Sequence, residues 1–274
     1  MTTIVKRGIT GSIYVLSVIA AVYLPPLVSV FYFGVIATLG LYEFYNNIEK
    51  TTDILPDKIL GYIFTVCYYV AIFLHAINNE VLTIMLIYLV ILFFLMFIRS
   101  LYRKNAKPFT DIAYTFLGII YIVIPLSLAV FLRQAFHPII LMSIFIFVWC
   151  NDTFAYLTGM KFGKHKLFER ISPKKTWEGS IGGFLSVIIA AIIISYLSEE
   201  VPIVHLIITA IITSVIGTYG DLVESMFKRQ LGIKDSGNIL PGHGGILDRF
   251  DSMLLALVAV FFYYLIFGYN LASI

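Results

Sequence analysis

Five carboxylates lie near the ends of three apolar segments in the C-terminal half of the chain. Asp152 lies inside one segment, Asp221 and Glu224 close a second, and Asp248 and Asp251 open a third. The spacing of three within each pair predicts that both acids share a helix face. A carboxylate inside an apolar segment is costly unless paired or coordinated, and oxygen ligands without a nearby cysteine favour Mg²⁺. The pattern predicts a magnesium site, although Asp251 could simply cap a helix and Glu224 could be a solvated helix-end charge.

Basic residues surround these acids in two polar stretches, 160–180 and 223–251, which together carry ten Lys and Arg. Acids that hold a metal and cations that take up phosphate charge are what a Mg²⁺-polyphosphate requires. Gly242, Gly244 and Gly245 could adopt positive φ and let backbone amides approach a phosphate. We expect His243, which lies between them, to donate a hydrogen bond to phosphate. The sequence therefore predicts a phosphate-binding loop before the last apolar segment.

Several of these features have a purely structural alternative. Lys174 and Lys175 could bind anionic headgroups or set the topology, and Trp177 could be an interfacial anchor. Gly179 and Gly183 form a small-xxx-small pair, for which close helix packing is the preferred interpretation.

The composition indicates a membrane protein. Of the 274 residues, 60% are hydrophobic and 13% are charged, whereas soluble domains carry about 25% charge. A spanning helix needs about 20 apolar residues, and we expect an all-α polytopic integral membrane protein with about nine transmembrane helices. The predicted spans are Ile9–Tyr23, Leu27–Tyr45, Ile59–Ile77, Val81–Ile98, Ile112–Leu132, Pro138–Gly159, Ile181–Leu197, Ile203–Leu222 and Ser252–Gly268. Pro125 predicts a kink in the fifth span.

The distribution of positive charge predicts the topology. With a cytoplasmic N-terminus and nine spans, 18 of the 19 Lys and Arg fall in cytoplasmic segments, and only Arg133 falls outside. The positive-inside rule requires far less bias. The C-terminus then lies outside, as does the short loop Asn78–Glu80, and both long polar loops face the cytoplasm. We divide the chain into four N-terminal spans (1–110) and a catalytic region of five spans (111–274).

The residues from 225 to 251 resemble the signature of CDP-diacylglycerol synthases, also called phosphatidate cytidylyltransferases. The matching positions are Ser225-Met226-Phe227-Lys228-Arg229, Lys234-Asp235-Ser236-Gly237, Leu240-Pro241, His243-Gly244-Gly245 and Asp248-Arg249-Phe250-Asp251. Ser172 to Gly179 and the pairs Asn151-Asp152 and Ala155-Tyr156 also resemble the family. The resemblance covers about Trp149 to the C-terminus, and the first half matches only as a bundle of apolar helices.

The resemblance implies that CTP and phosphatidic acid react, with Mg²⁺ and optionally a second cation, to CDP-diacylglycerol and pyrophosphate in a prokaryotic cytoplasmic membrane. Asp221 and Asp248 are the principal candidate metal ligands, with Asp152 and Asp251 as further candidates. The remaining expected site residues fall into two groups. Candidate catalytic residues are Lys174, Lys175, Lys228, Arg229, Lys234, Asp235, His243 and Arg249; candidate substrate-binding residues are Ser172, Thr176, Ser225, Gly242, Gly244 and Gly245.

Two other functions remain open at this level. A CTP-dependent transferase could act on another lipid phosphate, such as a polyprenol or archaeal lipid. A cation-coupled transporter would instead place acids near the midplane within repeated broken helices, and no internal repeat is seen. A homodimer is an option, and no basic tract suggests a nucleic-acid partner.

The predicted topology can be tested by cysteine labelling. In a chain lacking Cys67 and Cys150, we expect Glu199→Cys to react with an impermeant maleimide added outside the cell. Lys164→Cys should react only after the membrane is opened. Labelling of both positions from the same side would contradict the nine-span topology.

Overall fold

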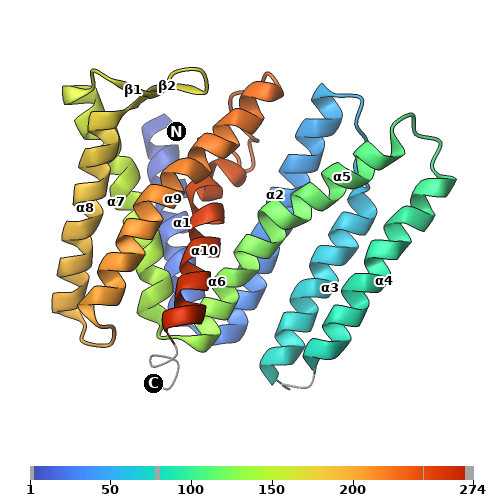
Figure 1. Ribbon diagram of the computed structural model, residues 1–274, viewed down its shortest axis with the longest axis horizontal. Coiled ribbons are helices and arrows are strands. Elements are labelled where there is room, and N and C mark those ends of the chain that lie inside the picture. The colour runs from blue at the N-terminus through green and yellow to red at the C-terminus, as the bar shows by residue number, and fades with distance from the viewer. Residues whose placement is uncertain (1–2, 78–80, 243, 269–274) are drawn as a thin grey trace. The chain divides into compact units, whose positions relative to one another are not determined.

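The computed structural model describes residues 3–77, 81–242 and 244–268, and helices dominate it (Figure 1). The chain forms two compact units. Unit 1 comprises Met1–Val130 and Leu231–Asp248, and unit 2 comprises Phe131–Gln230 and Arg249–Ile274. These boundaries do not fall at residue 110. The expected division there, between N-terminal spans and a catalytic region, concerns function and stays a prediction. The loop Asn78–Glu80 lies outside the described residues.

Unit 1 is a bundle of long helices in which α2 is central. Its α2 packs against α1, α3, α5 and the π-helical turn η1, and α3 packs against α4. The elements are α1 (Thr3–Tyr23), α2 (Pro26–Thr51), α3 (Lys58–Ile77), α4 (Val81–Tyr102), α5 (Pro108–Gly118) and η1 (Ile119–Val123), followed by α6 (Ile124–Ala135), which crosses the unit boundary.

The π-helical turn ends at Val123, two residues before Pro125, where the sequence predicted a kink. Proline has no backbone N–H and cannot complete the regular helical ladder. A π-helical turn is one of the recognised causes of a kink. The single predicted span Ile112–Leu132 therefore corresponds to the joined elements α5, η1 and α6.

Buried carboxylates hold the segment between α2 and α3. Asp111 of α5 is 4% exposed, and it accepts hydrogen bonds from the Leu55 N–H at 2.8 Å and from Asn105 Nδ2 at 2.8 Å. Asp57 accepts from Arg99 Nε at 2.7 Å. These carboxylates order a polar turn because buried backbone groups need partners.

Unit 2 consists of four helices and a small hairpin. In Figure 1, α7 and α8 lie side by side, and both pack against α9. The elements are α7 (Pro138–Phe162), β1 (Lys166–Phe168), β2 (Ser172–Thr176), α8 (Trp177–Leu197), α9 (Ile203–Gln230) and α10 (Leu247–Phe267), whose first two residues belong to unit 1. The two strands are antiparallel, with Lys166 opposite Thr176. The sequence did not predict this hairpin.

Helix α8 has one small-residue face and one large apolar face. A Cβ on Gly179 would lie 2.7 Å from the Ala155 carbonyl oxygen, and one on Gly183 would lie 2.8 Å from the Asn151 carbonyl oxygen. Close packing of Gly179 and Gly183 against α7 is therefore confirmed. Trp177 and Ile181, one turn apart, are more than half exposed. Such a stripe suits contact with lipid tails.

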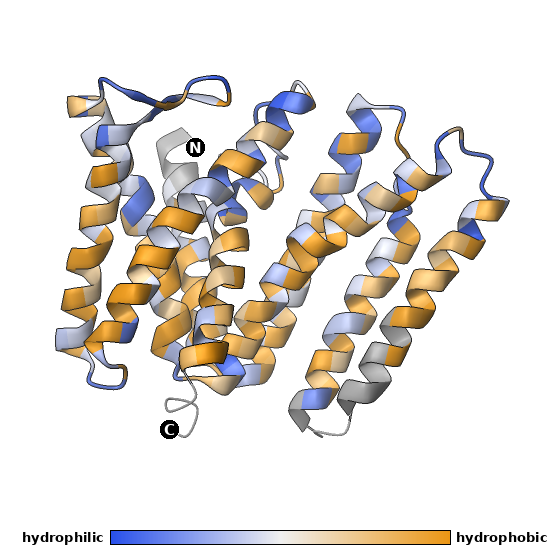
Figure 2. Cartoon of the chain, viewed as in Figure 1, coloured by the Kyte–Doolittle hydropathy of each residue, from blue (hydrophilic) through white to orange (hydrophobic). Residues whose placement is uncertain are grey.

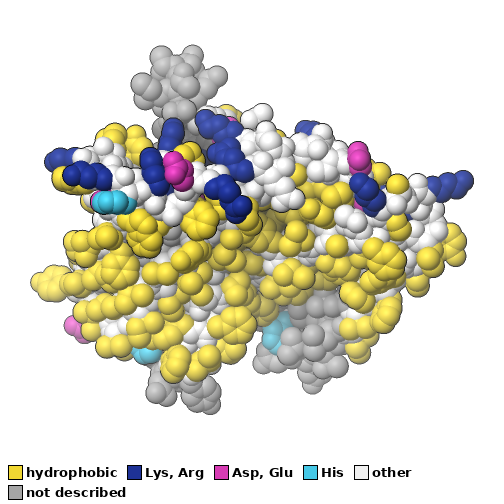
Figure 3. Space-filling model, turned by 45° about the horizontal axis from the view of Figure 1, so that its top comes forward, with side chains coloured by type: hydrophobic (Ala, Val, Ile, Leu, Met, Phe, Trp, Pro, Cys, Tyr) yellow, Lys and Arg dark blue, Asp and Glu magenta, His cyan; other side chains and the backbone are white. Residues whose placement is uncertain are grey.

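The membrane character predicted from composition is confirmed. Among the described residues, seven helices are long and apolar enough to cross a bilayer. Two shorter apolar stretches, Gly8–Tyr23 and Val90–Tyr102, overlap the other two predicted spans, the second of them only in part. Figure 2 shows hydrophobic residues along the helices and hydrophilic ones in the hairpin, and Figure 3 shows hydrophobic side chains over most of the drawn face. The chain is an all-α integral membrane protein, and the count of nine and the orientation remain predictions.

The tight α7–α8 contact predicts that Gly183→Ala destabilises unit 2. The added methyl group meets the Asn151 backbone, which cannot rotate away, and such overpacking costs about 1–3 kcal/mol. Gly8→Ala is the matched control, because a Cβ at Gly8 meets nothing within 4 Å. Thermal unfolding in detergent should show a lower midpoint for Gly183→Ala only. Equal midpoints would show that α7 and α8 can move apart at little cost.

Candidate functional site

A polar pocket of about 500 Å³ lies in unit 2 between α7, β2, α8 and α9. Asp152 of α7 lines it, as do Lys174 and Lys175 of β2 and Thr218 and Asp221 of α9. The size is in the usual range for ligand pockets. The pocket thus brings together two predicted metal ligands and two predicted phosphate-binding lysines.

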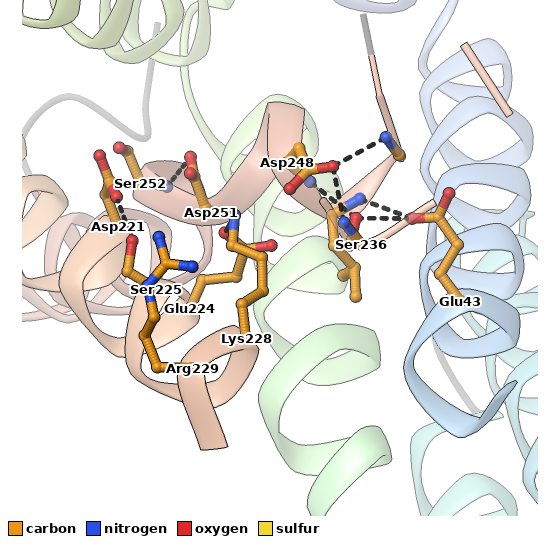
Figure 4. Close-up of polar contacts among 12 residues, drawn as sticks. Glu43, Asp221, Glu224, Ser225, Lys228, Arg229, Ser236, Asp248, Asp251 and Ser252 are labelled. Carbon is orange, nitrogen blue, oxygen red and sulfur yellow. Dashed lines mark hydrogen bonds and ion pairs between the residues drawn. The ribbon is translucent and has the colours of Figure 1, made fainter. Parts of the chain in front are cut away.

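Two polar contacts hold the carboxylate of Asp221 in this pocket. Its Oδ2 forms an ion pair with Lys175 Nζ at 2.6 Å, and both side chains are about one quarter exposed. Ser225, one turn further along α9, donates its hydroxyl to Asp221 Oδ1 at 3.1 Å (Figure 4). These two contacts fix the orientation of the Asp221 carboxylate.

Glu224, on the same helix, has a more enclosed environment. It is fully buried and forms an ion pair with Lys228 at 2.6 Å, one turn away. Asp251 of α10 interacts electrostatically with Asp152, Asp221 and Glu224. The alternative that Glu224 is a solvated helix-end charge is wrong, because its side chain has no access to solvent.

The four acids of unit 2 therefore repel one another and are partly neutralised by cations. Asp152 is repelled by Asp221 and attracted by Lys175 and Arg249. Mutual repulsion of this kind is what a bound cation relieves, and carboxylate oxygens are the donors that Mg²⁺ prefers. Within the described part of the chain, however, no three His, Cys, Asp or Glu side chains converge on one metal position. The donor chemistry fits a hard cation, and Mg²⁺ remains a prediction.

The hairpin positions the remaining candidates of unit 2. Thr176 is buried, and its hydroxyl caps α8 by accepting the Gly179 N–H at 3.2 Å. Arg229 Nε donates to the Ile171 carbonyl oxygen at 3.5 Å, which ties the hairpin turn to α9. Ser172 is half-buried in β2. Thr176 and Arg229 thus have structural contacts in this structure, and their proposed contacts with substrate remain predictions.

An apolar groove adjoins the polar pocket. Its volume is about 280 Å³, and Phe168, Trp177 and Phe184 contribute to its walls. Ser180 and Thr218 line both the groove and the pocket. The two cavities therefore lie next to each other and share two wall residues, an arrangement that suits a molecule with a polar end and an apolar end.

The part of the signature in unit 1, Leu231–Asp248, is called the signature loop, and it folds around Asp248. Its Oδ2 accepts the Ser236 N–H at 2.9 Å and the Gly245 N–H at 2.8 Å (Figure 4). The Gly245 N–H, which was predicted to approach a phosphate, therefore donates to Asp248 in this structure. Asp248 and Asp221 belong to different units, so their joint binding of one metal remains a prediction.

The loop glycines behave partly as expected. Gly242 has a φ of 80° and Gly244 has a φ of 83°, which confirms the predicted positive φ at both. Lys234 and Asp235 are exposed. His243 lies outside the described residues.

Sequence reasoning missed two contributors. Thr218 lines both cavities, and its position three residues before Asp221 on α9 was the available signal. Glu43 of α2 is 3% exposed and accepts the Leu247 N–H of the signature loop at 3.0 Å. Its charge inside a predicted span, Leu27–Tyr45, was a signal that went unused.

Known proteins with similar sequences include several phosphatidate cytidylyltransferases. The phosphatidate cytidylyltransferases of Staphylococcus saprophyticus and Staphylococcus haemolyticus are each 42% identical to this chain over 170 residues. The same holds for that of Staphylococcus aureus. The aligned region covers 62% of this chain and 65% of each relative, which is less than two thirds of the relatives' length. The family match is more extensive: residues 5–267 match the Cytidylyltransferase family, so that the resemblance seen in the sequence is confirmed and the chain belongs to this family.

Proposed function

We propose that this chain transfers the cytidylyl group of CTP to phosphatidic acid, giving CDP-diacylglycerol and pyrophosphate. The observation that carries the proposal is that the polar pocket and the apolar groove lie next to each other and share Ser180 and Thr218 in their walls. A lipid phosphate needs both environments at once. The family and the names of the relatives agree with this substrate pair.

In the proposed reaction, a phosphate oxygen of the lipid attacks the α-phosphorus of CTP. A new P–O bond forms there, and the bond from the α-phosphorus to the oxygen bridging to the β-phosphate breaks, so pyrophosphate leaves. A phosphomonoester has a second pKa near 6 and is largely dianionic at neutral pH. No side chain has to remove a proton, and the work of the protein is positioning and charge neutralisation.

The residues of the polar pocket suit that work. Lys174 and Lys175 supply positive charge for phosphate oxygens, and Asp152 and Asp221 would hold Mg²⁺, with Asp248 and Asp251 as further proposed ligands. When bound, Mg²⁺ would neutralise the polyphosphate and favour departure of pyrophosphate. A phosphate in the pocket could also take the place of Asp221 as the partner of Lys175, because both side chains are partly exposed.

The apolar groove would take the acyl part of the lipid. Trp177 and Phe168 lie at its border and are exposed, which suits a position where lipid enters. We propose that the pocket opens to the cytoplasm, where CTP is found, in agreement with the positive charge of the hairpin.

The proposal predicts a specific activity in the purified protein. With CTP labelled at the α-phosphate, label should appear in a lipid product only with phosphatidic acid and Mg²⁺, together with one pyrophosphate per product. Polyprenyl phosphate and an archaeal lipid phosphate, tested in parallel, identify the alternative substrates. Transfer to either of these in preference to phosphatidic acid would reassign the substrate, and no transfer to any of them would overturn the function.

Asp221→Asn should lower this turnover about 100-fold or more, as removal of a key electrostatic group does. The fold should persist, because the substitution keeps the side-chain volume. Asp53→Asn is the control, since the Asp53 side chain is 93% exposed and should leave turnover unchanged. Near-normal turnover of Asp221→Asn would exclude a role for this carboxylate in the reaction.

Two glycines of positive φ allow the loop to be tested separately. Gly244→Ala and Gly232→Ala both force alanine into the left-handed region, at a cost of about 1–2 kcal/mol. The new Cβ at position 244 would lie 2.9 Å from Asp248 Oδ2, while that at 232 would meet nothing within 4 Å. We expect similar melting temperatures but about tenfold lower turnover for Gly244→Ala alone. Equal turnover in both variants would show that the loop around Asp248 is not part of the active site.

A further inference from the structure

Glu43 is an unusual residue of unit 1. It lies within α2 between apolar neighbours, and only 3% of its surface is exposed. Its Oε2 accepts the Leu247 N–H at 3.0 Å and the Ser236 hydroxyl at 3.2 Å (Figure 4). A buried carboxylate on a helix of the N-terminal half is thus bound to the signature loop, about 200 residues away in sequence.

Ser236 connects Glu43 to Asp248. The Ser236 hydroxyl donates to Glu43 and accepts the Asp248 N–H at 3.3 Å, while the Ser236 N–H donates to Asp248 Oδ2. The Asp248 carboxylate therefore has its orientation set by a residue whose own hydroxyl is held by Glu43. A change at Glu43 would reach Asp248 through one side chain.

The surrounding residues are shaped to admit this contact. A Cβ on Gly245 would lie 2.5 Å from Glu43 Oε2, and one on Gly237 would lie 2.7 Å from Glu43 Cδ. Asn47, one turn beyond Glu43, donates its amide to the Ser236 carbonyl oxygen at 2.6 Å. A Cβ on Gly40, one turn before Glu43, would lie 3.3 Å from the Leu247 side chain.

Gly40, Glu43 and Asn47 follow the spacing of one helix face. This face of α2 is therefore a docking surface for the signature loop: glycine provides space, the carboxylate accepts hydrogen bonds, and the amide donates one. Asp111 is a buried carboxylate of the same unit that holds the turn between α2 and α3 instead, which makes it a suitable comparison.

We propose that Glu43 is a positioning residue of the transfer reaction, which holds the signature loop and thereby orients Asp248. The inference rests on the proposed function for its kinetic part. The proposal gives the N-terminal helices a role in the reaction. The sequence motifs, which lie in the C-terminal half, had suggested none for them.

The test compares Glu43→Gln with Asp111→Asn. Both substitutions convert a buried carboxylate of unit 1 into an amide of the same size, and both disturb an acceptor of backbone N–H groups. Glutamine at position 43 keeps one oxygen that can accept from Leu247 and Ser236, but it removes the negative charge that strengthens both hydrogen bonds. Its N–H₂ group would also replace the buried Oε1 atom. We expect both variants to lose some thermal stability, and only Glu43→Gln to affect the loop and the reaction.

Two measurements separate the possible outcomes. Hydrogen–deuterium exchange of peptides covering residues 235–248 should be at least tenfold faster in Glu43→Gln than in the parent protein or Asp111→Asn. The kcat for CTP-dependent transfer should fall at least tenfold in Glu43→Gln, with a KM for phosphatidic acid within about threefold of the parent value.

A third variant tests the path through Ser236. If Glu43 acts through this residue, Glu43→Gln combined with Ser236→Ala should lower kcat little more than the stronger single substitution does. Additive losses would show that the two residues act separately and overturn the proposed path.

Unchanged exchange of the loop, or a loss of kcat no greater than that of Asp111→Asn, would overturn the role of Glu43. If the parent protein transfers no cytidylyl group, the proposed function fails, whereas the exchange measurement still decides whether Glu43 holds the loop.

Discussion

Each carboxylate placed among apolar helices has to be neutralised or hydrogen-bonded, and this constraint organises both units. An aspartate at the centre of a membrane helix costs about 2.5–3.5 kcal/mol on insertion scales. In unit 1, Glu43 and Asp248 meet this demand with backbone N–H groups and the Ser236 hydroxyl. In unit 2, Asp221 and Glu224 meet it with lysines. The acids therefore determine where loops and basic residues have to lie.

Hydropathy predicted most of the helices because the bilayer requires apolar segments of fixed length. The pairing of Gly179 and Gly183 with α7 was also predictable, since few other interpretations suit glycines spaced four apart in such a helix. The hairpin of Lys166–Phe168 and Ser172–Thr176 was not predictable, because these short strands are rich in charge and show no apolar alternation. Its existence depends on tertiary contacts such as that of Arg229 with Ile171.

The candidate site shows the same division between local and tertiary information. Asp152, Asp221 and Lys175 could be selected from residue type and position, and the structure places all three at one pocket. The hydrogen-bond acceptor of the Gly245 N–H could not be predicted, because both the Asp248 carboxylate and a bound phosphate can accept from a backbone N–H. Glu43 could have been noticed for its charge, but its connection to Ser236 spans 193 residues and appears only once the chain is folded.

The two ion pairs of α9 differ in a way that bears on function. The Glu224 carboxylate is fully buried and the Lys228 side chain is 12% exposed, so separating them would leave a buried charge without this ion pair. Lys175 and Asp221 are 27% and 25% exposed and line a pocket, so either can exchange its partner for a ligand at lower cost. Of the lysines expected to bind phosphate, Lys175 is therefore better placed to act on substrate, and Lys228 is better placed to hold Glu224. Exposure, rather than charge alone, distinguishes a binding lysine from a structural one.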